Sequence, residues 1–279
     1  MLDLTQPRAK IVFASVAMVL GLFLFFPLFW MITTSFKPEG ELFVRIPSLL
    51  PASPTLRNYI GALTRSDLPT YLQNSLITAG AGALLTTLLA TMAAYSFAKF
   101  SYRGRTALML LMIAAQMFPF AVLLITLYPA MQALGLLDSR LGLTLSYIVF
   151  ALPSGTYMLY SYFVNIPTEI IEAARADGAS ELRILARIVL PLSIPGLVTV
   201  GLYAFMWAWN DLLYSLTLIT DPGLRTVGPG LLLSYLGESR NDWGGAMASS
   251  LIASLPVVIA FALVQRFFIQ GLTAGAVKS

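Results

Sequence analysis

The sequence predicts an all-α polytopic membrane protein with six transmembrane helices. Hydrophobic residues make up 58% of the 279 residues and charged residues only 11%, whereas about a quarter of the residues in a soluble domain are charged. The few charges are also clumped, so several charge-free runs reach the roughly 20 apolar residues that cross a bilayer as a helix. A soluble fold could not bury so many runs of this kind.

Six apolar runs mark the expected spans. They cover residues 11–32, 72–98, 107–128, 141–163, 194–216 and 247–267. The first run follows Arg8 and Lys10, as the apolar core of a secretory signal would. It is longer than such a core, however, and no small-x-small cleavage pattern follows it. We therefore predict a retained first span within a single transmembrane domain of residues 1–279.

The orientation of the spans is predicted from the basic residues near their ends, because Lys and Arg in short loops favour the cytoplasm. The short turn between the second and third runs carries Lys99, Arg103 and Arg105 and no acid. With this turn inside the cell, both termini are expected to be cytoplasmic. The net charge of +4 follows the two sides of the membrane and is not an indication of nucleic-acid binding.

The residue types limit the chemistry that this chain could perform. It contains no Cys and no His, which excludes catalysis by these residues and zinc sites built from them. No lysine follows a glycine, so the usual phosphate-binding loop is absent. Asp211 is the only acid inside an apolar run. We therefore predict no catalytic residue, no metal site and no cofactor bound by this chain.

The connection between the fourth and fifth runs, residues 164–193, predicts two short helices. Thr168 and Ser180 are placed to cap them, and Gly178 suits the left-handed conformation that ends a helix. The second helix is expected to stop at Pro191. Its apolar face is predicted from helical spacing. That face comprises Leu182, Leu185, Ala186 and Val189.

This connection resembles the cytoplasmic signature loop of binding-protein-dependent ABC importer permeases. The signature reads Glu-Ala-Ala, three residues, Gly, nine residues, Ile, one residue and Leu-Pro. Every spacing is kept here, with Glu172, Ala173, Ala174, Gly178, Ile188, Leu190 and Pro191 at the matching positions. The resemblance implies a cytoplasmic coupling helix between spans four and five that docks in a groove on an ATPase subunit. The alternative is an ordinary juxtamembrane helix.

Other segments are similar to the carbohydrate branch of the same family. They are Asn74-Ser75, residues 93–98, residues 135–137, residues 151–153 and Trp209-Asn210-Asp211. The ending, residues 271–279, is similar to the cytoplasmic tail of the maltose-type six-span subunit, although that tail more often has glycine at the positions of Ala276 and Ser279. The resemblance implies that Thr273, Gly275 and Lys278 contact the ATPase subunits. The alternative is a disordered terminus.

The resemblance implies that the chain is a permease subunit of an ATP-driven importer for a sugar or sugar-like solute. It would form half of the translocation pathway as a multi-pass protein of the bacterial cytoplasmic (inner) membrane. The implied partners are a second homologous permease, two copies of an ABC ATPase subunit, an extracytoplasmic solute-binding protein and membrane lipid. ATP and magnesium would bind to the ATPase. A self-sufficient channel or secondary carrier would leave the docking loop unexplained, and an intramembrane enzyme would lack catalytic groups.

Four residues within the runs are candidates for the pathway or its gate, and each has a structural alternative. Gln116 could instead form a hydrogen bond between helices, and Pro119 is expected to kink the third span. Asn210 and Asp211 could cap a helix at the outer interface. If Asp211 only caps a helix, replacing it with Asn should have little effect.

Overall fold

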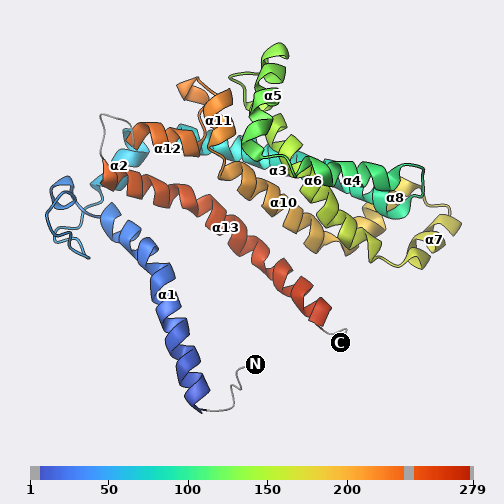
Figure 1. Ribbon diagram of the computed structural model, residues 1–279, viewed down its shortest axis with the longest axis horizontal. Coiled ribbons are helices and arrows are strands. Elements are labelled where there is room, and N and C mark those ends of the chain that lie inside the picture. The colour runs from blue at the N-terminus through green and yellow to red at the C-terminus, as the bar shows by residue number, and fades with distance from the viewer. Residues whose placement is uncertain (1–6, 236–241, 277–279) are drawn as a thin grey trace. The chain divides into compact units, whose positions relative to one another are not determined.

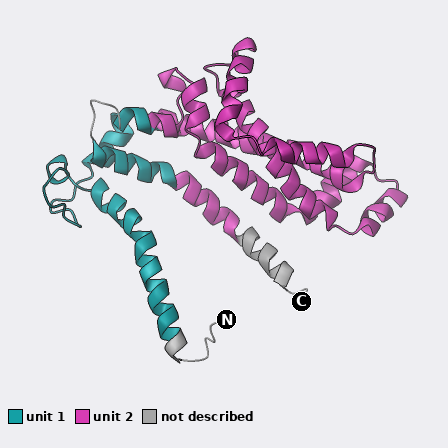
Figure 2. Ribbon diagram, in the orientation of Figure 1, with its two compact units in different colours: residues 1–68, 231–254 teal, residues 69–230, 255–279 magenta. Residues whose placement is uncertain are grey.

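A computed structural model describes residues 7–235 and 242–276, with the side chains of residues 10–235 and 242–265. The described residues form helices joined by loops, with no strand among them (Figure 1). The chain forms two compact units (Figure 2). Unit 1 contains Met1–Leu68 and Leu231–Ser254, and unit 2 contains Pro69–Gly230 and Leu255–Ser279.

Four helices in the described part of the chain are long and apolar enough to cross a membrane. They are α1 (Pro7–Ser35), α3 (Leu68–Lys99), α6 (Arg140–Val164) and α13 (Trp243–Ala276). Two bent helix pairs also qualify: α4 (Arg105–Ala115) with α5 (Phe120–Ala133), and residues Glu181–Leu192 with α10 (Ile194–Trp209). Counting each bent pair as one span gives six candidate spans, the number that the sequence predicts. Residues 181–192 of the second pair, however, belong to the predicted loop, and only α10 corresponds to the fifth predicted span.

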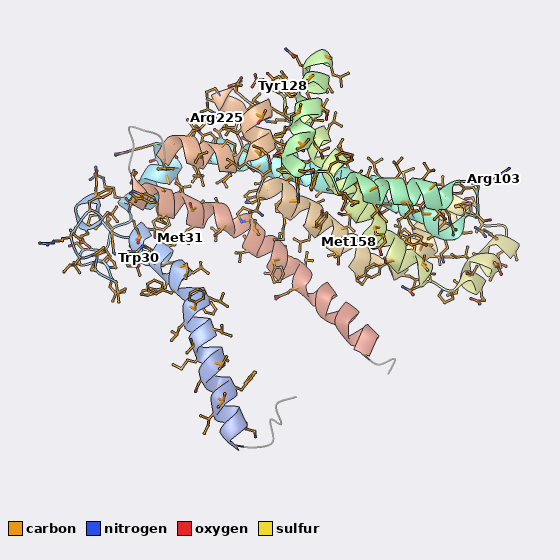
Figure 3. The ribbon with its side chains drawn as sticks, viewed as in Figure 1. Trp30, Met31, Arg103, Tyr128, Met158 and Arg225 are labelled. Atoms are coloured by element: carbon orange, nitrogen blue, oxygen red, sulfur yellow. The ribbon has the colours of Figure 1, made fainter. Side chains whose placement is uncertain are left out.

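The third predicted span is not one continuous helix. The axes of α4 and α5 differ by 101°, and the break lies at residues 116–119. Pro119 is the N-cap of α5, and proline disfavours helical conformation in the residue before it. The expected kink at Pro119 is therefore a full break. Figure 3 shows Tyr128 on α5, which projects away from α6 within unit 2.

The fifth predicted span ends earlier than expected. α10 stops at Trp209, and a separate short helix, α11 (Leu213–Leu218), follows. Asn210 and Asp211 lie in the break between them. Residues 213–216, predicted to continue the span, therefore begin a new element.

The core of unit 2 is the packing of α6 against α10, which lie side by side (Figure 1), and against α3, whose Ala90, Ala94 and Tyr95 share a buried cluster with both helices. Buried residues recur every four positions on α6, at Leu143, Tyr147, Ala151, Gly155 and Leu159, and on α10, at Gly196, Val200, Ala204 and Ala208. Residues four apart form the ridges by which helices interlock. Many of these residues are small, which lets membrane helices approach closely.

Two glycines mark the closest approach of α6 to α10. A Cβ added at Gly155 would lie 2.9 Å from Cγ1 of Val200, and one added at Gly196 would lie 2.8 Å from the ring of Tyr162. Real Cβ atoms almost never show such contacts, so glycine is required at both positions for the helices to pack as they do.

In unit 1, the loop that follows α1 is held by a buried lysine. Lys37 is 1% exposed, and its Nζ donates to the carbonyl of Ser48 and lies 4.6 Å from the ring centre of Trp30. Asn58, on α2 (Arg57–Thr64), donates to the carbonyls of Ser35 at 2.8 Å and Lys37 at 2.9 Å. The loop is therefore fixed to the end of α1 and to α2, and most of the apolar surface of α1 is left exposed, as lipid contact requires.

We expect Gly196→Ala to reduce the thermal stability of the detergent-solubilised protein. The new methyl group would overlap the ring of Tyr162, and overpacking of this kind costs about 1–3 kcal/mol. Gly80→Ala is the matched control, because a Cβ at Gly80 on α3 has no neighbour within 4 Å. Stability is measured as the fraction that stays monodisperse on size exclusion after heating. Equal losses in both variants would contradict the close packing of α6 and α10.

Candidate functional site

The candidate coupling helix is α7 (Thr168–Ala176), at one end of unit 2 (Figure 1). Its N-cap is Pro167, and no side chain caps it, so the prediction that Thr168 caps this helix is wrong. Glu169 lies in the first turn, where an acid is favourable for the helix dipole. α7 is amphipathic, because Ile171 is 1% exposed while Glu172 and Ala173 are exposed.

Gly178 ends α7 as predicted. Its φ is +77°, in the left-handed region. Its N–H donates to the carbonyl of Arg175, and the N–H of Ala179 donates to the carbonyl of Ala174, both at 3.0 Å. These two bonds form a Schellman motif, in which glycine avoids the steric cost of a Cβ. A Cβ at Gly178 would meet nothing within 4 Å, so backbone conformation, not crowding within this chain, favours glycine here.

The second helix of the loop is not the regular α-helix that the sequence predicts. α8 (Glu181–Ile184) leads into a π-helix, η2 (Leu185–Val189), and then into α9 (Leu190–Leu192). Ser180 is the N-cap as expected, although its side chain makes no capping hydrogen bond. A π-helix bonds residues five apart, and Ile184 and Val189, five positions apart, are both 0% exposed.

The π-helix also changes which residues form the apolar face. Leu182 is 75% exposed and Ala186 is exposed as well, so the face predicted from a regular α-helix is wrong at both positions. The prediction that the second helix stops at Pro191 is wrong, because α9 includes Pro191 and ends at Leu192. Ile188 and Leu190 are half-buried, and Ile188 packs against the buried core.

The buried residues of the loop belong to the same core as the spans. One continuous cluster contains Ala90, Ala94 and Tyr95 of α3, Leu159 and Phe163 of α6, Ile166, Ile171, Ile184 and Val189 of the loop, and Val200 of α10. The loop is therefore a packed extension of the helix bundle. A force applied to α7 would reach the spans through side-chain contacts.

Polar contacts also join the loop to α3. The hydroxyl of Tyr95 donates to Oε2 of Glu181 at 2.7 Å, and Nε of Arg175 donates to Oε1 of the same carboxylate at 2.6 Å. Nζ of Lys99 donates to the carbonyl of Ile166 at 2.7 Å. Sequence reasoning missed these contacts, because Tyr95 and Glu181 are 86 positions apart and no local pattern joins them.

At the opposite end of unit 2, the buried carboxylate of Asp211 caps the first turn of a helix from one residue before the N-cap, Leu212. Asp211 is 6% exposed and accepts hydrogen bonds from the N–H of Tyr214 at 3.1 Å, the N–H of Ser215 at 2.8 Å and the hydroxyl of Tyr147 at 3.1 Å. The capped helix is α11, and Tyr147 belongs to α6. The capping interpretation holds for Asp211, which in addition joins α11 to the bundle.

The other pathway candidates have structural contacts too. Nε2 of Gln116 donates to Oγ of Ser154 on α6 at 2.5 Å, which is the hydrogen bond between helices that the sequence offered as an alternative. Nδ2 of Asn210 donates to the carbonyl of Met206 on α10 at 2.8 Å. Gln116 and Asn210 are both exposed. Their role in a pathway remains a prediction.

The loops at this end are joined through Asn74, which is 0% exposed. Its Nδ2 donates to the carbonyls of Gly223 at 3.0 Å and Arg225 at 2.9 Å, and its Oδ1 accepts from Nε of Arg140 at 2.9 Å. The segment Asn74-Ser75, part of the family resemblance, therefore holds the beginnings of α3 and α6 to the loop after α11.

Asp138 makes a second connection between the same loops. Its carboxylate accepts from the hydroxyl of Thr220 at 2.7 Å and from the N–H of Asp221 at 2.8 Å. The hydrogen bond from the Thr220 hydroxyl is the main reason that the pKa of Asp138 lies below its usual value. The loop is therefore held best when this carboxylate is ionised.

The basic turn and the loop after α11 lie far apart in unit 2. Figure 3 shows Arg103, from the basic turn, and Arg225, from the loop after α11, at opposite ends of the unit. The basic turn is expected on the inner side of the membrane, and the side on which each loop lies stays a prediction. Of the tail residues, Thr273 and Gly275 belong to α13, while the side chain of Thr273 and the whole of Lys278 lie outside the described part of the chain. The residues that are described hold no group of three or more acids that could bind a metal ion.

These features define an integral membrane protein of the transport class: a bundle of apolar helices with a packed loop at one end that presents an exposed helix face. Residues 86–274 match the family of binding-protein-dependent transport system inner membrane components, and the chain belongs to this family. The resemblance of residues 172–191 to the signature loop of this family is therefore confirmed. The protein is an ABC importer permease subunit, and its family places it in the inner membrane.

Similar proteins cover nearly the whole chain. The sulfoquinovosyl glycerol transport system permease SmoH of Agrobacterium fabrum is 38% identical over 96% of this chain and 93% of its own length. The trehalose/maltose transport system permease MalG of Thermococcus litoralis is 35% identical over 94% of both chains. In a crystal structure of a bacterial ABC transporter that imports alginate, one chain is similar with a TM-score of 0.84 at 22% identity, over 93% of this chain and 96% of that chain. This last likeness shows the fold.

We expect Asp211→Asn to destabilise the protein, in contrast to the small effect expected from the sequence. The amide of Asn has only one acceptor oxygen. Its NH2 group would face a donor that now bonds to the second carboxylate oxygen, so that donor would lose its partner. A buried donor left unpaired costs about 1–3 kcal/mol. Thermal stability in detergent is the measurement, with Tyr147→Phe as the comparison, since that change removes one of the three bonds.

The expected order of stability is wild type, then Tyr147→Phe, then Asp211→Asn. An Asp211→Asn protein as stable as the wild type would contradict a structural role for the carboxylate. A loss of uptake without a loss of stability would instead favour the gating role.

Proposed function

We propose that this permease subunit serves an ATP-driven importer for a sugar or sugar-like solute and forms half of the translocation pathway. The names of the similar proteins support this substrate class, since they include permeases for sulfoquinovosyl glycerol and for trehalose/maltose. The other half of the pathway would be a second homologous permease. An extracytoplasmic solute-binding protein would deliver the solute, as the similar alginate transporter is described in complex with a periplasmic protein.

The observation that carries the proposal is the exposed face of α7 on a loop that is packed into the core. Glu172 and Ala173 are exposed while Ile171 is buried, so this face is available to another chain. Small residues allow a partner backbone to approach closely, and Glu172 offers a charge for a basic groove. We propose that α7 docks on an ATPase subunit, and that two copies of that subunit serve the two permeases.

ATP and magnesium bind to the ATPase subunits in this proposal, and this chain supplies movement. Closure of two ATPase subunits on ATP displaces α7, and the shared core carries the displacement into α3, α6 and α10. The bundle then changes between inward-facing and outward-facing states as packed bodies. The tail, residues 271–279, would add a second contact with the ATPase.

The orientation follows from the same loop. Lys99, at the end of the basic turn, donates to the carbonyl of Ile166 beside α7, so the basic turn and the loop lie at one end of the bundle. Basic turns favour the cytoplasm, and the ATPase is cytoplasmic. We therefore propose that both termini are cytoplasmic, with Arg45 and Arg225 on the outer side.

The topology is testable with single cysteines, because the natural chain has none. We expect Arg45→Cys to react with a membrane-impermeant maleimide added to intact cells stripped of the outer membrane. Arg103→Cys should react only after the cells are opened, and both side chains are exposed in the structure. The opposite labelling pattern would contradict the proposed orientation.

Glu172→Lys should weaken binding of the ATPase subunit. A charged partner left opposite a like charge in a partly buried interface typically costs about 2–5 kcal/mol. Copurification of the ATPase with the tagged permease measures this loss, and reversing the partner charge should restore part of it. Arg183→Ala is the control, because Arg183 is exposed on α8 and an exposed charge contributes little.

Gly178→Val tests the backbone of the same loop. The left-handed conformation of Gly178 costs an L-residue roughly 1–2 kcal/mol, and a β-branched residue suits it least. We expect normal membrane insertion with reduced ATPase copurification and solute uptake. If Glu172→Lys and Gly178→Val both copurify the ATPase as the wild type does, the docking role of α7 is wrong.

A further inference from the structure

The carboxylate of Glu181 joins three segments of unit 2 at one point. Oε1 accepts from Arg175 in the last turn of α7, at 2.6 Å, and Oε2 accepts from the hydroxyl of Tyr95 on α3, at 2.7 Å. Glu181 itself is the first residue of α8. Each oxygen therefore serves a different element. This arrangement is not part of the Glu-Ala-Ala signature, and nothing in the family resemblance assigns it a role.

The first bond fixes the angle between α7 and α8. These helices are separated only by residues 177–180, where the chain turns at Gly178 with its positive φ. A single glycine turn is a place where one short helix can pivot about the next. Arg175 precedes the turn and Glu181 follows it. Their ion pair therefore bridges the turn and limits the rotation of α7 relative to α8.

The second bond connects the loop to α3, a helix that is not adjacent to the loop in the chain. α7 follows α6 through residues 165–167, and α8 leads to α10 through η2 and α9. Helix α3 precedes α6 and α10 in the chain, and its Tyr95 is 86 positions from Glu181. A movement of α7 reaches α6 and α10 through covalent connections, but it reaches α3 only through side-chain contacts. Two of these contacts are hydrogen bonds: Lys99 at the end of α3 bonds to Ile166, before α7, and Tyr95 bonds to Glu181, after α7.

Stability alone does not account for the arrangement. The side chains of Arg175 and Glu181 are 38% and 39% exposed, and exposed ion pairs contribute little to folding free energy. The folding free energy of this region comes instead from the buried apolar cluster. The ion pair is left to hold the angle between α7 and α8. Tyr95, by contrast, is 5% exposed and packs edge-on against Phe163 at 6.5 Å between ring centres, so its hydroxyl is held in a fixed position.

We propose that Glu181 is a positioning residue that passes the movement of α7 to α3, so that the three core helices respond to the ATPase together. The inference rests on the proposed function, because it requires that an ATPase subunit moves α7. It adds the residues by which the most remote core helix receives that movement. Without Glu181 the ATPase still binds and α6 and α10 still respond to it, while α3 loses its response.

The test uses the cysteine-free chain in its complex with the native ATPase subunits, whose own accessible cysteines have been replaced. A single fluorophore is attached at Leu84→Cys on α3 or at Val149→Cys on α6, both exposed positions. The probe added is ATP with magnesium and vanadate, which requires no knowledge of the transported solute. The change in emission at each position reports whether that helix responds.

In the wild type we expect a response at both positions. Glu181→Ala and Tyr95→Phe should lose the response at Leu84→Cys and keep it at Val149→Cys, with normal copurification of the ATPase. Glu181→Gln should keep part of the α3 response, since its amide can still bond to Arg175 or Tyr95. The double variant Tyr95→Phe/Glu181→Ala should be no worse than Glu181→Ala, as expected for two residues in one contact. Arg183→Ala is the control that keeps both responses.

The outcomes separate this inference from the function on which it rests. If the ATPase fails to copurify with the wild type, the proposed function fails. If the ATPase copurifies and α3 still responds in Glu181→Ala and Tyr95→Phe, the inference is overturned and the proposed function stands. Should Glu181→Ala prove unstable, Tyr95→Phe and Glu181→Gln carry the test, and an equal loss of response on α3 and α6 in them would show general loosening and also overturn the inference.

Discussion

The close contact of α6 with α10 and α3 determines how the other elements of unit 2 are held. Lipid tails are as apolar as the side chains of these helices, so burial of apolar surface gives little drive for helices to associate within a bilayer. Association depends instead on close packing, and Gly155 and Gly196 let α6 and α10 approach to a distance that a Cβ would prevent. Because the buried cluster continues from these helices into α7, α8 and η2, the same packing that holds the spans also positions the cytoplasmic loop.

The break in the fifth span is possible because its free backbone N–H groups find a partner nearby. A backbone group without a partner is costly in the hydrocarbon region, so irregular backbone occurs there only where it is satisfied. At the end of α10, the carboxylate of Asp211 accepts the free N–H groups of Tyr214 and Ser215. At the start of α5, the hydroxyl of Tyr214 donates to the carbonyl of Phe120 at 3.1 Å. The two breaks are therefore connected through Tyr214, with Trp207 and Phe150 stacked beside them at 3.9 Å between ring centres.

The loop after α6 has two faces with different tasks. Its buried face, with Ile171, Ile184 and Val189, belongs to the core of the bundle, and its outer face carries Glu172 and Ala173. A π-helix makes the two compatible, because it brings Ile184 and Val189 onto one side of the segment. Family membership, which residues 86–274 establish, is consistent with this division. The arrangement at Glu181 then gives the outer face a directional connection to α3.

The sequence by itself determined the class of protein, the approximate spans, the position of the loop and the conformation of Gly178, because each follows from local composition or from backbone sterics. Apolar length and the clumping of charge are readable residue by residue, and only glycine suits the turn at position 178 without strain. The tertiary structure alone decided that the third span breaks at Pro119, that α10 ends at Trp209 and that Leu182 is exposed, because a proline in an apolar run is compatible with either a kink or a break, and a π-helix shifts the register of a face. It also decided the partners of Asn74, Asp211 and Glu181. These contacts join residues up to 151 positions apart, and such pairs meet only once the helices have packed.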